Sequence, residues 1–354
     1  MPFVRQTIKL DQLIIMKCYF LYNAQKESTE NRKPFFQILQ NIFESKGRYA
    51  YQPENANVFL INNYDCADQV LKIKRKYPSQ LFIHRVDEPI KSFKNVFSWR
   101  DDIVRFLNCH VADATIFQSQ WSKEEHHRFN ISSCTSLSTI IPNAPDPLLF
   151  NTRQRATLSP VRKPRLISNN WSENWRNDFE TLQWIDNNLN FDRYDMTFIG
   201  KSPITFNNIR HIQPVSSQEM ASWLKQSDIY ILAAPKQKAC SEVLLEAIHC
   251  GVPIVAVNSA SNSEFIGNGG ALYNDIGDIP ETIRKVLKNY TTYQKAIQNP
   301  RLPEIAEKYY TFMQSCEKDL KDNSKQLSRL HFVYLRCVLM AWKIFGTIEA
   351  MRQT

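Results

Sequence analysis

Short apolar runs alternate with amphipathic segments along the chain, and this alternation predicts parallel β-sheets covered by helices. In the first half, apolar residues from Phe35 to Phe43 recur at helical spacing, with Pro34 suited to the first turn and Gly47 to the stop. Further helices are expected at 101–113 and 121–129. The strands expected in this half are residues 17–23, 57–64, 80–86, 114–120 and 136–144.

A proline-rich stretch, residues 142–165, reads as a linker, and the alternation restarts beyond it. Strands are expected at 165–171, 194–200, 228–234 and 253–258, and helices at 179–189, 217–226 and 241–250. The predicted fold class is α/β, with two doubly wound parallel-sheet (Rossmann-like) domains facing a cleft. We expect a first domain over 1–150, a second over 151–300, and C-terminal helices over 301–354 that pack back on the first domain.

The C-terminal segment 328–351 is expected to be a helix, because Phe332, Leu335, Leu339, Trp342 and Phe345 fall at helical spacing. Two interpretations are open: the apolar side packs on the first domain, or the helix lies on a membrane surface as a peripheral contact. The chain has no run of 18 uncharged apolar residues, so no transmembrane helix is expected. We expect a cytoplasmic protein, with peripheral attachment to the inner membrane face as the second possibility.

The composition narrows the choice of partners. With 43% hydrophobic and 22% charged residues, the 354-residue chain resembles ordinary globular proteins, and its net charge of +9 suits nucleic acid, an anionic membrane or a phosphorylated small molecule. The basic residues are dispersed and no nucleic-acid-binding motif is present, so no nucleic-acid partner is expected. Eight cysteines without C-x-x-C spacing indicate reduced thiols. The adjacent His126 and His127 point in different directions on a helix, so no metal site is expected there.

The stretch 228–267 carries the strongest chemical signal. It reads as a strand, a loop, a helix that starts near Ser241, a glycine stop at Gly251 and another strand. Ser241 is a suitable N-cap, and the amides of the first helical turn form an anion site that suits a diphosphate. Glu242 and Glu246 share one face of this helix, and a carboxylate there can accept hydrogen bonds from a ribose diol.

Several segments resemble the GT-B glycosyltransferases, specifically glycosyltransferase family 4. The segment ACSEVLLEAIHCGVPIVA (239–256) looks like the donor-site helix of that family. Further similar segments are LFIHRVDEPI (81–90), ADATIFQSQWSKEE (112–125), IIPNAPDPLLF (140–150), NNWSENWRNDFETLQWID (169–186) and MTFIGKSP (196–203). The resemblance covers about residues 17–290.

This resemblance implies an enzyme that moves a sugar from a nucleotide-diphosphate sugar to a glycan or lipid-linked acceptor, with retention and without a metal or other cofactor. Glu246 is expected to bind the ribose, and Ser241, Val243, Leu244 and Leu245 to supply backbone amides. The remaining donor-binding residues implied are Asn170, Trp171, Ser172, Arg176, Gly200, Lys201, Lys238, Ala239 and Cys240. The expected catalytic residues are His84, Arg85 and Asp87, with His84 in contact with the transferred sugar. The alternative is a surface ion pair between Arg85 and Asp87 beside a passive histidine.

The chain departs from the family pattern at the positions that approach phosphate and sugar. Lys238 stands where the family has a glutamate, and Asn177 and Asp178 stand where it has Lys-Gly. The family's Gly-Gly element before a glutamate is replaced by serines and small residues before Glu264, in a chain with only eight glycines. Two hypotheses follow. The protein is a divergent transferase, in which Lys238 and Arg176 suit a more anionic donor such as a uronic acid, or it is a catalytically degraded partner of an active transferase.

Overall fold

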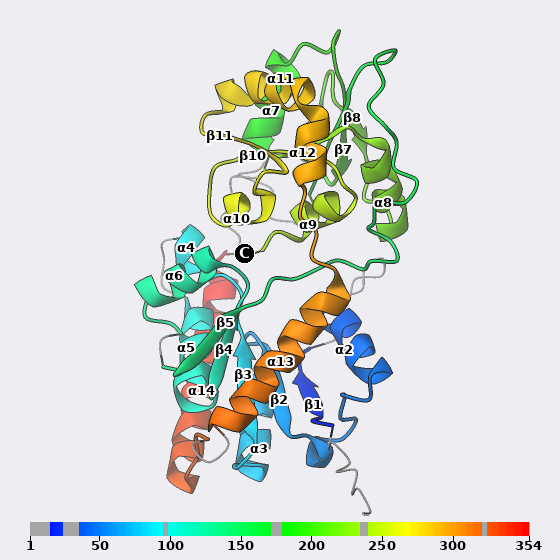
Figure 1. Cartoon of the computed structure of the whole chain (residues 1–354). Helices are drawn as coiled ribbons and strands as arrows, with labels where there is room; N and C mark the ends of the chain where they lie inside the picture. Colours follow the sequence, from blue (N-terminus) through cyan, green and yellow to red (C-terminus); the bar gives the residue numbers. More distant parts are fainter. Residues whose placement is uncertain are drawn as a thin grey trace, which may run out of the picture.

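The protein was analysed as a computed structural model, which describes residues 15–23, 35–94, 98–132, 134–170, 179–233, 240–320 and 324–353. Two parallel sheets form two domains, one above the other in Figure 1. The predicted class of two doubly wound parallel-sheet domains is confirmed.

The first domain contains β1 (Cys18–Leu21), α2 (Phe35–Ser45), β2 (Val58–Asn62), α3 (Ala67–Lys76), β3 (Leu81–Arg85), α4 (Lys91–Lys94), α5 (Trp99–His110), β4 (Ala114–Phe117), α6 (Gln120–Arg128) and β5 (Leu137–Ile140). The second contains β6 (Arg165–Asn170), α7 (Phe179–Asn188), β7 (Asp195–Gly200), β8 (Arg210–Ile212), α8 (Ser217–Gln226), β9 (Ile229–Leu232), α9 (Glu242–His249), β10 (Ile254–Val257), α10 (Asn262–Ile266), β11 (Gly270–Tyr273), α11 (Ile279–Lys288) and α12 (Tyr290–Ala296). The last two helices are α13 (Leu302–Leu320) and α14 (Arg329–Gln353).

The strands of the first sheet lie in the order β1-β2-β3-β4-β5. Cys18 of β1 pairs with Val58 of β2 and also bridges Tyr49 in parallel. The chain therefore passes the outer edge of β1 before it returns to β2, and this reversal allows helices to cover both faces of the sheet. Side chains of α2 pack on one face, and those of α3 and α5 pack on the other.

The second sheet has the order β11-β10-β9-β6-β7-β8, all parallel. The winding direction reverses between β6 and β9, because the strands that follow β6 extend first to one side and then to the other. In an open parallel sheet, ligands bind outside the carboxyl ends of the strands at such a reversal. The end of β6, at Asn170, is therefore a favoured ligand position.

Two C-terminal helices return to the first domain. Figure 1 shows α13 crossing diagonally from the second domain over the first sheet, where Tyr309 and Met313 join the core formed by α2 and the strands. On the opposite face, Phe332, Leu335 and Leu339 of α14 are buried against α3 and α5. Phe345 departs from the expected apolar side, since its side chain is 63% exposed.

A disulfide joins Cys109, at the end of α5, to Cys134, in the segment before β5, with Cα atoms 4.8 Å apart. The expectation of reduced thiols is wrong for this pair, because residues 25 positions apart meet in the fold without any local spacing signal. The other six cysteines form no disulfide.

No helix in the described part of the chain is long and apolar enough to cross a bilayer.

We predict that Met313→Ala lowers the free energy of unfolding by about 2–5 kcal/mol, because it removes a fully buried side chain and leaves a cavity between α13 and the first sheet. Urea unfolding measures this change. The matched control is Gln314→Ala, an exposed position on the same helix, for which a change within about 0.5 kcal/mol is expected. If Met313→Ala and Gln314→Ala lower the free energy of unfolding equally, the packing of Met313 on the first sheet does not stabilise the fold.

Candidate active site at the domain junction

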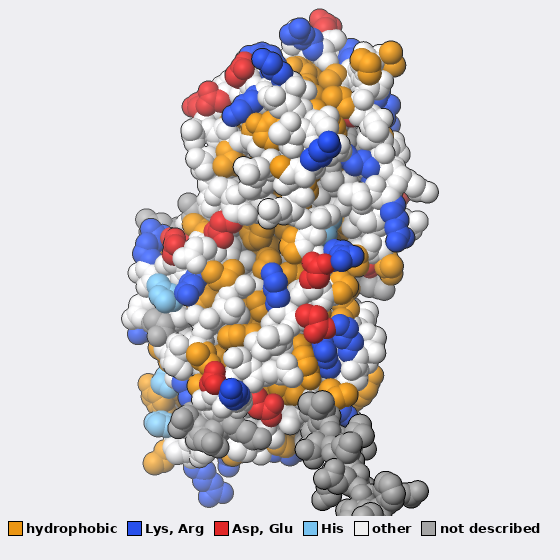
Figure 2. Space-filling view, viewed as in Figure 1, with side chains coloured by type: hydrophobic (Ala, Val, Ile, Leu, Met, Phe, Trp, Pro, Cys, Tyr) orange, Lys and Arg blue, Asp and Glu red, His pale blue; other side chains and the backbone are white. Residues whose placement is uncertain are grey.

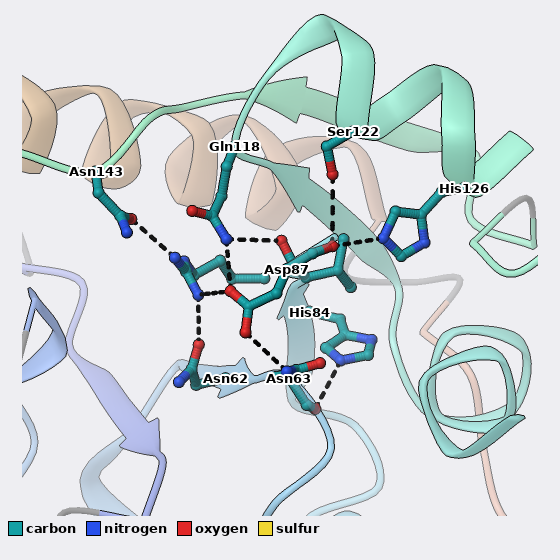
Figure 3. Close-up of polar contacts among 10 residues, drawn as sticks. Asn62, Asn63, His84, Asp87, Gln118, Ser122, His126 and Asn143 are labelled. Atoms are coloured by element: carbon teal, nitrogen blue, oxygen red, sulfur yellow. Dashed lines mark hydrogen bonds and ion pairs between the residues drawn. The ribbon is translucent and has the colours of Figure 1, made fainter. Parts of the chain in front are cut away.

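A buried guanidinium, that of Arg85, organises the carboxyl edge of the first sheet. Arg85 is the last residue of β3 and is 4% exposed. Its Nη1 donates to Asn62 Oδ1 at the end of β2 and to Asp87 Oδ1, both at 2.8 Å. Its Nη2 donates to Asn143 Oδ1, beyond β5, also at 2.8 Å. Arg85 therefore ties together two strand ends and the segment that leads to the second domain (Figure 3).

Asp87 is the accessible carboxylate of this cluster, with a side chain that is 37% exposed. Besides Arg85, its Oδ1 accepts a hydrogen bond from Gln118 Nε2 at 2.5 Å, and its Oδ2 accepts one from Asn63 Nδ2 at 2.7 Å. These donors come from the ends of three neighbouring strands, so the sheet holds the carboxylate in one orientation. A charged, fixed and partly exposed acceptor of this kind can receive a hydrogen bond from a ligand hydroxyl.

Two neutral histidines support the backbone around Asp87. His84 Nε2 donates to the carbonyl of Asn63 at 2.9 Å, and His126 Nε2 of α6 donates to the carbonyl of Asp87 at 2.7 Å. Burial lowers the pKa of each histidine to about 4, against a smaller opposing effect of these carbonyl contacts. Because His84 has no exposed surface, it does not reach a ligand in this conformation. The expected contact between His84 and the transferred sugar is therefore replaced by a positioning role.

The carboxyl edge of the second sheet contributes polar groups from β6, β7 and β9. Asn170 lies at the end of β6, opposite Gly200 at the end of β7. A Cβ atom on Gly200 would lie 2.4 Å from the Asn170 carbonyl oxygen, so only glycine fits there. Beside them, the Tyr230 hydroxyl donates to Asn169 Oδ1 at 2.8 Å. The predicted Lys201 follows Gly200 and is exposed.

Helix α9 begins beside this edge, as the sequence predicts. Glu246 is 2% exposed. Burial of Tyr230 raises the pKa of its hydroxyl, and the negative charge of Glu246 raises it further. Ser241 occupies the N-cap, but its side chain makes no capping hydrogen bond. The Leu245 amide donates to the Ser241 carbonyl at 3.0 Å and is used within the helix. The expectation that Leu245 offers a free amide is therefore wrong, whereas the amides of Ser241, Val243 and Leu244 belong to the first turn, which has no intrahelical acceptors.

Five predicted donor residues, Trp171, Ser172, Arg176, Lys238 and Ala239, lie outside the described residues.

Two contacts bring the domains together at these edges. In the first, Cys240 hydrogen-bonds the backbone of Asn143 in the segment that leaves the first domain. Burial raises the pKa of the Cys240 thiol to about 12, and this hydrogen bond and the positive charge of Arg85 act in the opposite direction. Cys240 immediately precedes the α9 N-cap, so the start of α9 faces the Arg85 cluster. Glu264 of α10 accepts hydrogen bonds from the amides of Gln120 and Trp121, at 2.7 and 2.8 Å. This carboxylate thus occupies the positive end of the α6 dipole across the junction.

Sequence reasoning missed the partners of Arg85 and Asp87, namely Asn62, Asn63, Gln118, Ser122, His126 and Asn143, and it missed the contact of Glu264 with α6. The available signal was positional, because Asn62, Asn63 and Gln118 each end or directly follow a strand. Polar residues at the carboxyl ends of neighbouring parallel strands meet at one edge. Within the described residues, no group of three or more histidine, cysteine, aspartate or glutamate side chains is arranged to hold a metal ion.

Comparison with known proteins agrees with this architecture. Residues 205–302 match the family described as Glycosyl transferases group 1. Sucrose-phosphate synthase from Thermosynechococcus elongatus is similar in structure, with a TM-score of 0.56 and 15% sequence identity over 84% of this chain and 83% of that one. Anabaena HepE in complex with UDP and glucose gives a TM-score of 0.60 and 12% identity over 87% of this chain and 100% of that one.

The chain has the GT-B fold. A third GT-B structure, named as trehalose-6-phosphate from E. coli bound with UDP-2-fluoro glucose, gives a TM-score of 0.57 and 9% identity over 79% of this chain and 77% of that one. No curated protein sequence matches the chain at a significant level. The matched family segment contains α9 and the strands on both sides of it, so it covers the helix that faces the Arg85 cluster of this GT-B protein.

The buried histidines predict a pH-dependent stability. Between about pH 6.5 and pH 4 the unfolded chain binds protons at His84 and His126 that the folded chain does not, so stability falls as pH falls through this range. We expect His84→Gln, which keeps a donor for the Asn63 carbonyl, to reduce the loss between about pH 7 and about pH 5 by about 2 kcal/mol. Urea unfolding at both pH values provides the measurement.

The control for this experiment is His127→Gln, since His127 is the exposed neighbour of His126 on the same helix. This variant should keep the pH dependence of the wild type, and His126→Gln should behave like His84→Gln. If all three variants lose the same stability between the two pH values as the wild type does, the buried histidines are not the source of the effect.

Proposed function

We propose that this protein is a glycosyltransferase that moves a sugar from a nucleotide-diphosphate sugar to a glycan or lipid-linked acceptor, with retention of configuration and without a metal. One observation supports the proposal: Cys240, the residue before the N-cap of α9 and within the segment that matches Glycosyl transferases group 1, hydrogen-bonds the backbone of Asn143 beside Arg85 of the first domain. A reaction between two substrates needs such a meeting of two sites, one on each domain.

The donor diphosphate is proposed to bind at the first turn of α9, where the amides of Ser241, Val243 and Leu244 and the helix dipole neutralise negative charge. As the donor bond breaks, charge develops on the departing diphosphate, and preorganised amides stabilise it without reorganisation. Glu246 is proposed to hold the ribose. Asn169 is a further candidate, because its Nδ2 is buried and makes no hydrogen bond within the described residues.

The acceptor is proposed to lie on the first domain, with a hydroxyl directed at Asp87. Asn63 and Gln118 hold this carboxylate on the sheet edge, and Arg85 balances its charge. Among His84, Arg85 and Asp87, only Asp87 then contacts substrate, and the other two are positioning residues. The catalytic role expected for these three residues of segment 84–87 is thus assigned to Asp87 alone, and the proposed reaction is unchanged.

The second candidate function is a GT-B protein without catalytic activity that binds or regulates an active glycosyltransferase. The residue that favours it is Lys238, which stands where the resemblance to glycosyltransferase family 4 implies a glutamate that binds sugar hydroxyls. A lysine donates hydrogen bonds but accepts none, so it cannot replace that contact in kind. In the first candidate function, the same lysine suits an anionic sugar such as a uronic acid.

Isothermal titration with uridine, guanosine and adenosine diphosphates separates the two candidates. We expect one of them to bind, and Glu246→Gln to weaken that binding about tenfold, because the ribose loses a charged acceptor. The matched control is Glu242→Gln, an exposed glutamate one turn earlier on α9, which should leave affinity equal or higher by removing negative charge near the diphosphate. If none of the three nucleotides binds the wild type, the degraded-site function is favoured and the transferase proposal fails.

A further inference from the structure

The outward side of α14 is apolar although nothing in the described chain covers it. Val333 is 58% exposed, Ile344 is 61% exposed and Phe345 is 63% exposed. With these residues, Leu330, Tyr334 and Met340 complete an exposed row in which 330 and 334, 333 and 340, and 340 and 344 are one or two helical turns apart, and we call this row the α14 stripe. Such spacing places the residues on one side of the helix. The opposite side, with Leu335 and Leu339, is already buried on α3 and α5.

Cations lie beside the α14 stripe. The Arg75 guanidinium of α3 is 4.6 Å from the centre of the Phe332 ring, and the Arg336 guanidinium of α14 is 6.0 Å from the same ring. Both arginines therefore lie along the seam between the two helices. Arg329 and Lys72 add exposed positive charge on the same two helices, and the described side chains of α14 include no carboxylate.

We infer that the α14 stripe and the flanking arginines bind an anionic lipid bilayer, with α14 lying in the plane of the headgroups. An interfacial helix combines a row of apolar side chains, which enter the acyl boundary, with Lys and Arg that meet anionic headgroups. The chain as a whole carries a net charge of +9, which favours the approach to such a surface. A second copy of the chain is a poorer partner, because a two-fold pairing of these rows would bring like charges together.

The α14 stripe extends toward the edge of the first sheet where the Arg85 cluster, which includes Asp87, lies. Gly346 of α14 lies so close to Trp99, the first residue of α5, that a Cβ atom there would be 2.6 Å from the Trp99 ring. A helix that follows a parallel strand starts near the carboxyl end of that strand, so the far half of α14 lies near the junction edge of the first domain. If the proposed function holds, a bilayer on α14 presents lipid-linked acceptors beside Asp87.

The experiment is flotation of the full chain with vesicles of phosphatidylcholine alone and with vesicles that also contain phosphatidylglycerol. We expect the wild type to float with the anionic vesicles and to bind the neutral vesicles about tenfold or more weakly. The triple variant Val333→Ser/Met340→Ser/Ile344→Ser should lose about tenfold or more of the binding to anionic vesicles. The double variant Arg75→Gln/Arg336→Gln should also bind less and lose most of the salt dependence.

The control is Leu148→Ser/Val161→Ser, which removes two strongly exposed apolar side chains outside α14 and should float like the wild type. The inference is overturned if the wild type does not float, or if the triple variant floats as well as the control. It is also overturned if sedimentation without lipid shows a dimer that only the triple variant dissociates. Nucleotide titration is independent of these results, so failure here and failure of the proposed transferase remain distinguishable.

Discussion

The buried guanidinium of Arg85 is the constraint on which the junction depends. Removing a cation from water is costly unless its donors are satisfied, and here oxygen atoms of Asn62, Asp87 and Asn143 provide that compensation. These three partners come from separate parts of the chain. The requirement to pair one charge therefore fixes the end of β2, the turn after β3 and the segment that leaves the first domain. The last of these is the start of the connection to β6 of the second domain.

Parallel sheets explain why two polar clusters face each other. Every strand of a parallel sheet ends at the same edge, so polar residues that follow buried strands collect there. Contacts across the junction come from segments that follow strands in both domains, as Cys240 with Asn143 and Glu264 with the start of α6 show. In the second of these contacts, the Glu264 carboxylate of the second domain accepts hydrogen bonds from the amides at the start of α6 in the first domain. Figure 2 shows Lys and Arg dispersed, and interspersed with Asp and Glu, over the face of the molecule that it draws, with no single large basic surface there.

The sequence predicts the strands well because parallel strands covered on both faces are continuous apolar runs, as in the fully buried VFLIN of β2. It does not reveal β8, which has three residues, none of them fully buried, and no such pattern. For the site, it identifies the HRVD segment and α9, yet it misplaces His84, because the end of a strand says nothing about which side chains the neighbouring helix covers. Gln118 and Asn143 join Arg85 and Asp87 only through the sheet order, and Cys109 meets Cys134 only through the packing of α5.

The departures from the family 4 pattern that the sequence resembles do not bear equally on the two halves of the proposed chemistry. Binding of a diphosphate at α9 depends on backbone amides and the helix dipole, which any sequence that forms this helix supplies. In the proposed function, a lysine in place of the glutamate at position 238 therefore leaves the diphosphate interaction in place and changes only the groups proposed to meet the sugar. The carboxylate of Asp87 is held by residues far from position 238 in the sequence. A change of sugar specificity thus requires fewer losses than a loss of nucleotide binding, and this asymmetry favours the transferase over the degraded partner.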